Sequence, residues 1–198
     1  MKTLKITAAC AALLLLSQPA FAEAFVRPFL EVISPNRDGY SSKVGAGGVV
    51  GTNLGAEREQ EVSLEFAGAQ WNTSEVSTAG IAAVRQRFVT CLVNYRYHVG
   101  PASAPVRFYV GPAIGMTNNR TSLATVGPAS IYAGDDSTWS FTWSGSAGLD
   151  IKLTERFHLD VGYRFLHVNA TDTRIHNITY PGDVLEANIA YAGVSFRF

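Results

Sequence analysis

A long alternation of apolar and polar residues between positions 139 and 168 constrains the fold of this chain more than any other feature. In residues 139–153, and again in residues 157–165, nearly every second residue is aromatic or aliphatic. The residues between them are serine, threonine, glycine or charged. A period of two over runs of this length is typical of β-strands. Because only a tight connection at Thr154 and Glu155 separates the two runs, they predict an antiparallel hairpin.

Residues 1–22 are predicted to be a cleavable signal peptide. Two lysines precede an apolar stretch at residues 8–16, and an Ala-Phe-Ala triplet of the kind that signal peptidase reads ends at Ala22. The apolar stretch is shorter than the ~20 residues that a membrane-spanning helix needs. We therefore expect residues 23–198 to form the mature chain, as one β-barrel domain.

Composition excludes several classes of protein. The chain balances 16 lysine and arginine residues against 16 acidic ones, so no basic surface for nucleic acid is expected. Cys91 is the single cysteine of the expected mature chain, which rules out an internal disulfide. After residue 22, no apolar run has the length of a membrane-spanning helix.

Turn-rich segments divide the mature chain into eight expected strands. They are residues 25–33, 42–52, 60–70, 81–98, 106–116, 139–153, 157–168 and 184–198. The connections at 71–80, 117–137 and 169–182 are long and polar, and short turns alternate with them. This alternation is typical of outer-membrane barrels, whose even strand number leaves both termini in the periplasm. We therefore predict an all-β fold: an eight-stranded antiparallel transmembrane up-and-down β-barrel, preceded by a cleavable signal peptide.

The distribution of aromatic residues indicates which face of the sheet meets lipid. Rings such as Tyr95, Trp139, Trp143 and Phe196 lie toward the ends of the apolar faces, as in the aromatic girdles of membrane barrels. The opposite face combines small residues with charges of both signs, which suits the narrow interior of an eight-stranded barrel. Since lipid leaves no backbone group unpaired, the first and last strands are expected to pair and close the barrel.

Two segments resemble a known family. Residues 148–165, GLDIKLTERFHLDVGYRF, resemble the penultimate hairpin of OmpA/OmpX-like and opacity-type outer-membrane β-barrel proteins. The terminal segment GVSFRF resembles their last strand, and Phe198 resembles the C-terminal signal read by the barrel-assembly machinery. The resemblance implies the outer membrane of a Gram-negative bacterium. It leaves function open, because the family includes adhesins, structural proteins and enzymes.

Charged residues of both signs fall on the face expected to line the lumen. The carboxylates are Glu31, Glu61, Glu65, Asp150 and Asp160, and the cations are Arg27, Arg96, Arg107, Lys152, Arg164 and Arg197. They would form either a gated pore or proton path, or a structural ion-pair network. Because buried charges require partners and eight strands leave no continuous water channel, we predict the network.

Two histidines are candidates for chemistry. His167 lies near the outer rim, where PagL-type lipid A deacylases, which are also eight-stranded barrels, carry a His-x-Ser-Asn motif. Here Asn169 occupies the serine position, and an amide cannot replace the hydroxyl nucleophile that a histidine activates. His158 and Asp160 share one strand face, but the sequence offers no further ligands that would complete a metal site with them. We therefore expect no catalytic residue, no metal and no cofactor.

The sequence predicts a non-enzymatic surface or structural protein whose long loops mediate adhesion, host contact or envelope integrity. Its expected partners are outer-membrane lipid and lipopolysaccharide, the barrel-assembly machinery acting through Phe198, and surface ligands of the loops; the barrel is expected to be a monomer. A PagL-like hydrolase of lipid A and a soluble lipocalin-like ligand binder are the alternatives. The missing serine argues against the first, and the aromatic-ended outward faces and the terminal phenylalanine argue against the second.

Overall fold

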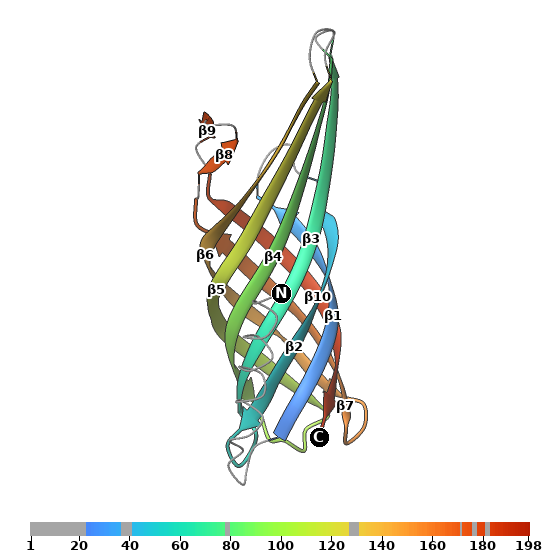
Figure 1. The fold of residues 1–198 in the computed structure, drawn as a ribbon. Helices are drawn as coiled ribbons and strands as arrows, with labels where there is room; N and C mark the ends of the chain where they lie inside the picture. The colour runs from blue at the N-terminus through green and yellow to red at the C-terminus, as the bar shows by residue number, and fades with distance from the viewer. Residues whose placement is uncertain are drawn as a thin grey trace.

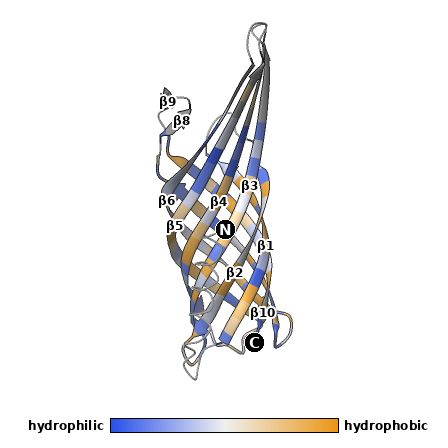
Figure 2. Cartoon of the chain, in the orientation of Figure 1, coloured by the Kyte–Doolittle hydropathy of each residue, from blue (hydrophilic) through white to orange (hydrophobic). Residues whose placement is uncertain are grey.

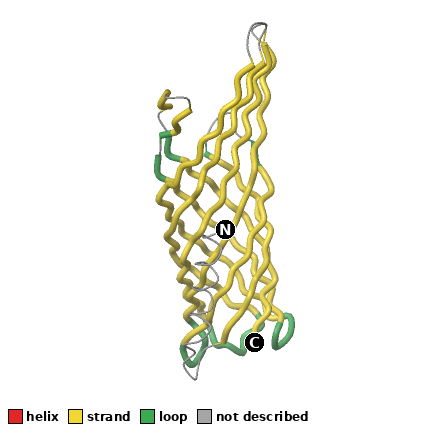
Figure 3. Tube along the Cα trace, viewed as in Figure 1, coloured by secondary structure: helices red, strands yellow, loops and turns green. Residues whose placement is uncertain are grey.

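The structure is a computed structural model that describes residues 23–36, 41–77, 80–126, 131–170, 172–175, 178–180 and 183–198. The expected signal peptide, residues 1–22, lies outside these described residues. Strands, turns and loops make up the described chain, as Figure 3 shows. None of the residues in these ranges forms a helix long and apolar enough to cross a membrane.

Eight long strands close into a barrel, and two short strands form a separate hairpin (Figure 1). The long strands are β1 (Glu23–Pro35), β2 (Lys43–Leu54), β3 (Gln60–Ser77), β4 (Gly80–Val99), β5 (Val106–Val126), β6 (Ile131–Lys152), β7 (Phe157–Val168) and β10 (Leu185–Arg197); the short ones are β8 (Thr173–Ile175) and β9 (Ile178–Tyr180). The barrel order is β1-β10-β7-β6-β5-β4-β3-β2, with antiparallel neighbours throughout. The predicted eight-stranded antiparallel barrel is therefore confirmed.

Pairing of the first and last strands closes the barrel. The ladder between β1 and β10 runs from Phe25 opposite Arg197 to Pro35 opposite Ala187. At its lower end the backbone N–H of Phe198 donates to the carbonyl of Ala24, at 3.0 Å. Glu23 and Phe198 thus lie at the same end of the barrel, which is also the end of the short turns.

The strands alternate between an apolar outer face and a buried inner face. On β4, Val93, Tyr95 and Tyr97 are exposed, whereas Asn94 and Arg96 are buried. The same parity places Phe141 and Trp143 of β6 outside. In Figure 2 the hydrophobic colour concentrates on the barrel and gives way to hydrophilic bands farther up β3 to β6. The apolar parity is therefore the outward one, as predicted.

Four strands continue well beyond the rest of the barrel. β3 and β4 stay paired up to Ser77 opposite Gly80, and β5 and β6 up to Val126 opposite Ile131. β4 and β5 pair along the same length, so the two hairpins form one four-stranded extension, visible in Figure 1. We call its residues, 69–77, 80–88, 119–126 and 131–138, the projecting sheet. Its outer strands have no ladder partner among the described residues beyond Gly68 and Thr142, and on β6 one further backbone hydrogen bond runs from the N–H of Asn169 to the carbonyl of Phe141, at 2.9 Å.

This extension corrects two predictions. Residues 71–80 and 117–137 were expected to be polar loops, but nearly all of their described residues belong to strands. Above the lipid both faces of a sheet can be polar, so the period-two pattern that marks a membrane strand is absent there. Pairing on both sides of β4 and β5 holds the polar strands together instead. The expected loop at 169–182 also differs, because it contains the small β8–β9 sheet.

Candidate functional site

A cluster of charged side chains fills the half of the lumen nearer the chain termini. It centres on Asp160 of β7, whose carboxylate accepts hydrogen bonds from Arg27, from Arg96 at 3.0 Å and from the hydroxyl of Tyr109 at 2.9 Å. Arg27 also pairs with Glu61, at 2.6 Å. All five residues are buried. Because they come from β7, β1, β4, β5 and β3, the cluster connects strands all around the barrel.

A second ion pair lies farther from the termini. Arg164 donates two hydrogen bonds to the carboxylate of Glu65, one of them 2.5 Å long, and both residues are buried. Arg164 belongs to β7 and Glu65 to β3, and three strands separate β7 from β3 on either side of the barrel. The pair therefore joins opposite walls across the lumen.

A third group of charges lies near the short turns. Arg197 pairs with Asp150 at 2.6 Å, and the Nδ1 atom of His158 lies 3.0 Å from the same carboxylate. His98 contributes its Nε2 atom, 3.4 Å from Glu61. At this end of the lumen, Asp150 is thus the partner of Arg197 and His158, and Glu61 is the partner of His98. The structure places His158 against Asp150, whereas Asp160 bonds to arginines, so the two do not form a joint metal site.

Three of the predicted lumen residues have other surroundings. Lys152 pairs with the exposed Glu155 at 2.9 Å, and this hydrogen bond lowers the pKa of Glu155. Arg107 is buried but donates to the backbone carbonyl of Arg58, at 3.2 Å. The Oε2 atom of Glu31 is buried without a hydrogen-bond partner among the described residues. The ion pairs therefore connect Glu61, Glu65, Arg96, Asp150, Asp160 and Arg164, together with Arg27 and Arg197.

Two tyrosines complete the network, and their role was not anticipated. The hydroxyls of Tyr109 and Tyr191 lie 2.8 Å apart, and Arg96 donates to Tyr191 at 3.2 Å. The guanidinium of Arg96 also lies 4.6 Å from the ring centre of Tyr109, within cation–π range. Gly162 makes room for this arrangement, since a Cβ there would lie 2.5 Å from one hydroxyl and 2.6 Å from the other. The signal that could have found both tyrosines is their parity, because Tyr109 lies on the same strand face as Arg107 and Tyr191 on the same face as Arg197.

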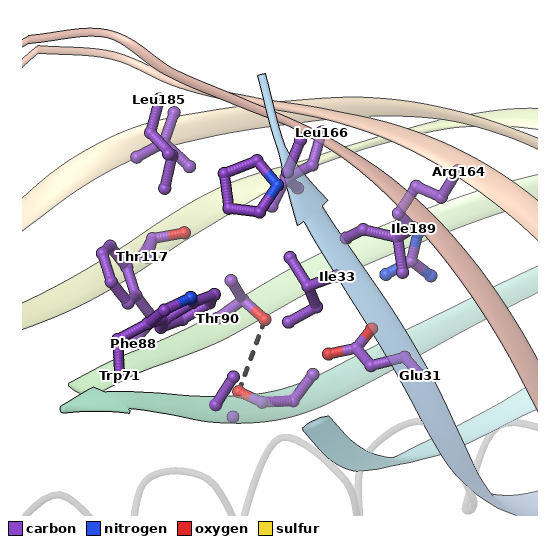
Figure 4. A pocket seen from close by; sticks show the side chains of 16 residues that line it. Glu31, Ile33, Trp71, Phe88, Thr90, Thr117, Arg164, Leu166, Leu185 and Ile189 are labelled. Atoms are coloured by element: carbon purple, nitrogen blue, oxygen red, sulfur yellow. Dashed lines mark hydrogen bonds between the residues drawn. The ribbon is translucent and has the colours of Figure 1, made fainter. Parts of the chain in front are cut away.

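The outer half of the lumen is apolar, in contrast to the charged half. Its core residues include Ile33, Ala67, Trp71, Leu166, Val168, Ala187 and Ile189. Between them lies a partly open cavity of about 30 Å³, shown in Figure 4. Trp71 and Phe88 form an edge-to-face pair on one side of it, with ring centres 5.0 Å apart. Glu31 and Arg164 line the opposite, deep end. The expected filling by charges therefore holds for only one half of the lumen, whereas small polar residues such as Thr117 and Thr142 are buried in the outer half as well.

Comparison with known proteins identifies the family. Residues 8–198 match the model of the outer membrane protein beta-barrel domain. The chain belongs to the outer membrane protein β-barrel family. This membership gives the barrel its location, the outer membrane of a Gram-negative bacterium, with the apolar outer face against lipid. No curated protein matches the chain.

Solved structures of other outer-membrane barrels share the fold. The attachment invasion locus protein Ail of Yersinia pestis, solved with the heparin analogue sucrose octasulfate, is 13% identical with a TM-score of 0.57, covering 90% of this chain and 99% of its own. Neisserial surface protein A is 12% identical with a TM-score of 0.54, covering 89% and 97%. OprG of Pseudomonas aeruginosa is 15% identical with a TM-score of 0.52, covering 90% and 96%. At these identities the likeness is one of fold.

In this outer-membrane barrel, His167 lies on the outward parity of β7. Its ring stacks on Trp143, with centres 5.1 Å apart, and its Nδ1 atom lies 3.3 Å from the carboxylate of Glu186. Neither contact supplies a nucleophile for acyl transfer. We therefore interpret His167 as a polar residue of the outer rim that packs on an aromatic ring and lies beside a carboxylate.

The outward face of the barrel changes character at one level of β4 and β5. Asn118 of β5 lies opposite Trp139, which ends the aromatic series of β6. One outward position farther along, Arg87 of β4 lies directly opposite Arg120 of β5. Both arginines are exposed, and Arg120 also pairs with Asp135. Like charges directly opposite each other are unfavourable, and Asp135 offsets the charge of Arg120. The outward apolar and aromatic series therefore ends at Trp139, just before this row of charges.

Proposed function

We propose that this barrel is a non-enzymatic surface protein whose projecting sheet mediates adhesion or other contact with ligands outside the cell. The observation that carries the proposal is the projecting sheet itself, which extends a paired four-stranded sheet beyond the level where β2 and β7 leave the ladder. A rigid platform of this kind presents side chains at low entropic cost to an incoming ligand.

The unpaired edges of the projecting sheet support a role in binding. Beyond Gly68, the outer backbone groups of β3 have no ladder partner among the described residues. On β6, beyond Thr142, the N–H of Asn169 still donates to the carbonyl of Phe141 and β8 lies nearby, so β3 presents the more open edge. Such edges are templates to which an extended peptide of another protein adds as a strand. Ail, which shares the fold, was solved with a heparin analogue, and the exposed Arg87 and Arg120 give this chain a comparable means of contacting sulfate or phosphate groups.

The proposed partners within the envelope follow from the barrel surface. Lipopolysaccharide carries phosphates at the outer surface of the membrane, the level of the Arg87 and Arg120 row, and arginine binds phosphate in a two-point geometry. The barrel-assembly machinery is proposed to read the terminal Phe198. A monomer is proposed because the membrane-embedded sheet is closed and leaves no edge for another copy.

Shortening the two hairpins tests the proposed contact. Residues 72–85 and 121–136 are each replaced by Asn-Gly, which joins the paired residues Trp71 and Gln86, and Arg120 and Ser137, through a two-residue hairpin turn. Bacteria that display the full barrel are expected to bind epithelial cells or extracellular matrix more strongly than bacteria lacking the protein, and the shortened barrel is expected to lose the difference. Heat-dependent gel mobility confirms that the shortened barrel folds. If this folded variant binds as strongly as the full barrel, the projecting sheet is not the surface that contacts the ligand.

A further inference from the structure

The apolar half of the lumen ends at a buried carboxylate that has an unsatisfied oxygen. Glu31 is only 4% exposed, and its Oε2 atom has no hydrogen-bond partner among the described residues. A buried charge without a partner is costly, so native structures keep such a group only where something compensates it. Glu31 lines the cavity together with Ile33, Ile189 and Arg164, all labelled in Figure 4.

One arginine lies beside two carboxylates at this end of the cavity. Both terminal nitrogens of Arg164 bond to Glu65, and its Nε atom has no hydrogen-bond partner among the described residues, so no hydrogen bond joins Arg164 to the Oε2 atom of Glu31. The remaining lining is aliphatic or aromatic, apart from the hydroxyls of Thr90 and Thr117, and the Thr90 hydroxyl donates to the carbonyl of Ala67. A ligand for this site therefore needs a donor or a positive charge at one end and carbon along the rest of its length.

We propose that the outer half of the lumen binds a small organic ammonium ion, a primary amine with a short apolar body, through Glu31. The ammonium donates to Glu31 Oε2, and the carbon atoms contact Ile33, Leu166 and Ile189. The cavity of about 30 Å³ is about two to three times the ~10–15 Å³ that one water molecule occupies. It therefore accommodates the charged head at Glu31, with the apolar body directed toward Trp71 and Phe88 on the opposite side of the cavity.

The surroundings favour this class of ligand over others. A bare metal ion needs several ligands, and the described residues contain no group of three or more His, Cys, Asp or Glu that would hold one. An anion would face the carboxylate of Glu31. A neutral apolar molecule would leave Glu31 uncompensated. A neutral donor such as an alcohol would supply the hydrogen bond but not the positive charge, so an ammonium ion matches the carboxylate and the apolar walls best.

A titration followed by methyl NMR tests the proposal. The full barrel is folded in phosphocholine detergent micelles, and propylammonium chloride is added, with 1-propanol as the neutral analogue of the same size. Propylammonium is expected to cause saturable shifts in the methyl groups of Ile33, Leu166 and Ile189, and 1-propanol none. Because the bond to a charged acceptor is lost, E31Q is expected to weaken the affinity about tenfold or more.

A second variant separates the site from general effects on the barrel. Ala187→Leu fills the cavity from β10 and leaves Glu31 in place, so it is expected to abolish the shifts. Ala192→Leu adds the same volume on the outward face of the same strand and is expected to bind like the wild type. Folding of each variant is verified by heat-dependent gel mobility. Equal affinity of E31Q and the wild type, or no saturable shift in the wild type because only water occupies the cavity, would overturn the proposal.

Discussion

Arg164 on β7 and Glu65 on β3 form a two-point ion pair between opposite walls of the barrel. Each charge is buried and has the other as its counter-ion. Loss of either member of such a pair destabilises the fold strongly, because the remaining charge stays buried without its counter-ion. It also occupies the lumen at the level where the charged half meets the apolar half.

Removing one member of this pair is expected to destabilise the barrel strongly. Glu65→Ala removes both hydrogen bonds of the terminal nitrogens of the buried Arg164, at a cost of about 3–5 kcal/mol. The double variant Glu65→Leu with Arg164→Met replaces both charges by apolar groups and is expected to recover most of the loss. Urea unfolding of the barrel in lipid vesicles, followed by tryptophan fluorescence, measures these values. Glu186→Ala, at an exposed rim position, is the control. A loss below about 1 kcal/mol in Glu65→Ala, within the range of ordinary substitutions, would contradict the expectation.

The lumen is expected not to conduct ions. The network around Asp160, the Arg164–Glu65 pair and the apolar outer half follow one another along the lumen axis, so a hydrated ion meets no continuous water path. In planar lipid bilayers the wild-type barrel is expected to give no steady open-channel current. Glu65→Ala with Arg164→Ala leaves the Asp160 network and the apolar outer half in place, so this variant is also expected to give no steady current. Porin-like steps in the wild type would show that the network opens.

Gly162 is expected to tolerate no larger residue. A methyl group there would lie 2.5 Å from the Tyr109 hydroxyl and 2.6 Å from the Tyr191 hydroxyl, so Gly162→Ala forces the pair apart. Overpacking of this kind costs about 1–3 kcal/mol. Gly145→Ala is the matched control, since a Cβ at that outward position meets nothing within 4 Å. Equal unfolding midpoints for the two variants would show that the tyrosines move aside freely.

The absence of lipid A chemistry is a further expectation. His167 contacts Trp143 and Glu186, and Asn169 occupies the position of the serine in the deacylase motif. Mass spectrometry of lipid A from cells with and without the protein is expected to show the same acyl composition. His167→Ala is expected to give the same spectrum again. A loss of one acyl chain that depends on His167 would establish an enzyme instead.

The arginine row is expected to retain lipopolysaccharide. Arg87→Gln with Arg120→Gln removes two exposed charges from neighbouring positions at the outer lipid boundary. Less lipopolysaccharide is expected to co-purify with this variant, because each arginine–phosphate contact contributes more than a neutral hydrogen bond. Arg156→Gln changes an exposed charge at the opposite, periplasmic end and is expected to leave the amount unchanged. Equal retention by all three proteins would argue against a phosphate contact at this row.

The membrane-embedded part of the fold could be predicted because lipid imposes a simple rule on it. Every lipid-facing position must be apolar, so the alternation in β4, β6 and β7 identifies both the strands and their outer face. The same rule predicted inward charges, and most of them meet across the lumen. It could not predict their partners, because the contact between Arg164 and Glu65 depends on which strands lie opposite one another after closure.

The structure differs from the sequence predictions in two regions that do not contact lipid, the projecting sheet and the lumen. Outside the membrane Asn72, Thr121 and Ser137 belong to strands, yet their polar neighbours give no alternation to detect. Inside the lumen, Ile33, Leu166 and Ile189 come from three strands and belong to one apolar core. The sequence of each strand does not show that these residues line a lumen, because an apolar residue on any buried strand looks the same. Tyr191 was missed for a similar reason, because its hydroxyl meets that of Tyr109 only after the barrel has closed.

The projecting sheet separates the place of anchoring from the place of contact. Beyond Trp71, which is in the lumen core, β3 continues for about 20 Å to Ser77 at ~3.3 Å per residue, paired with β4 along that length. Substitutions near the hairpin tips therefore leave the inserted half untouched. Residues at the hairpin tips can therefore change in shape and charge as the external ligands of the cell change. Such changes do not destabilise the membrane-embedded part of the same strands.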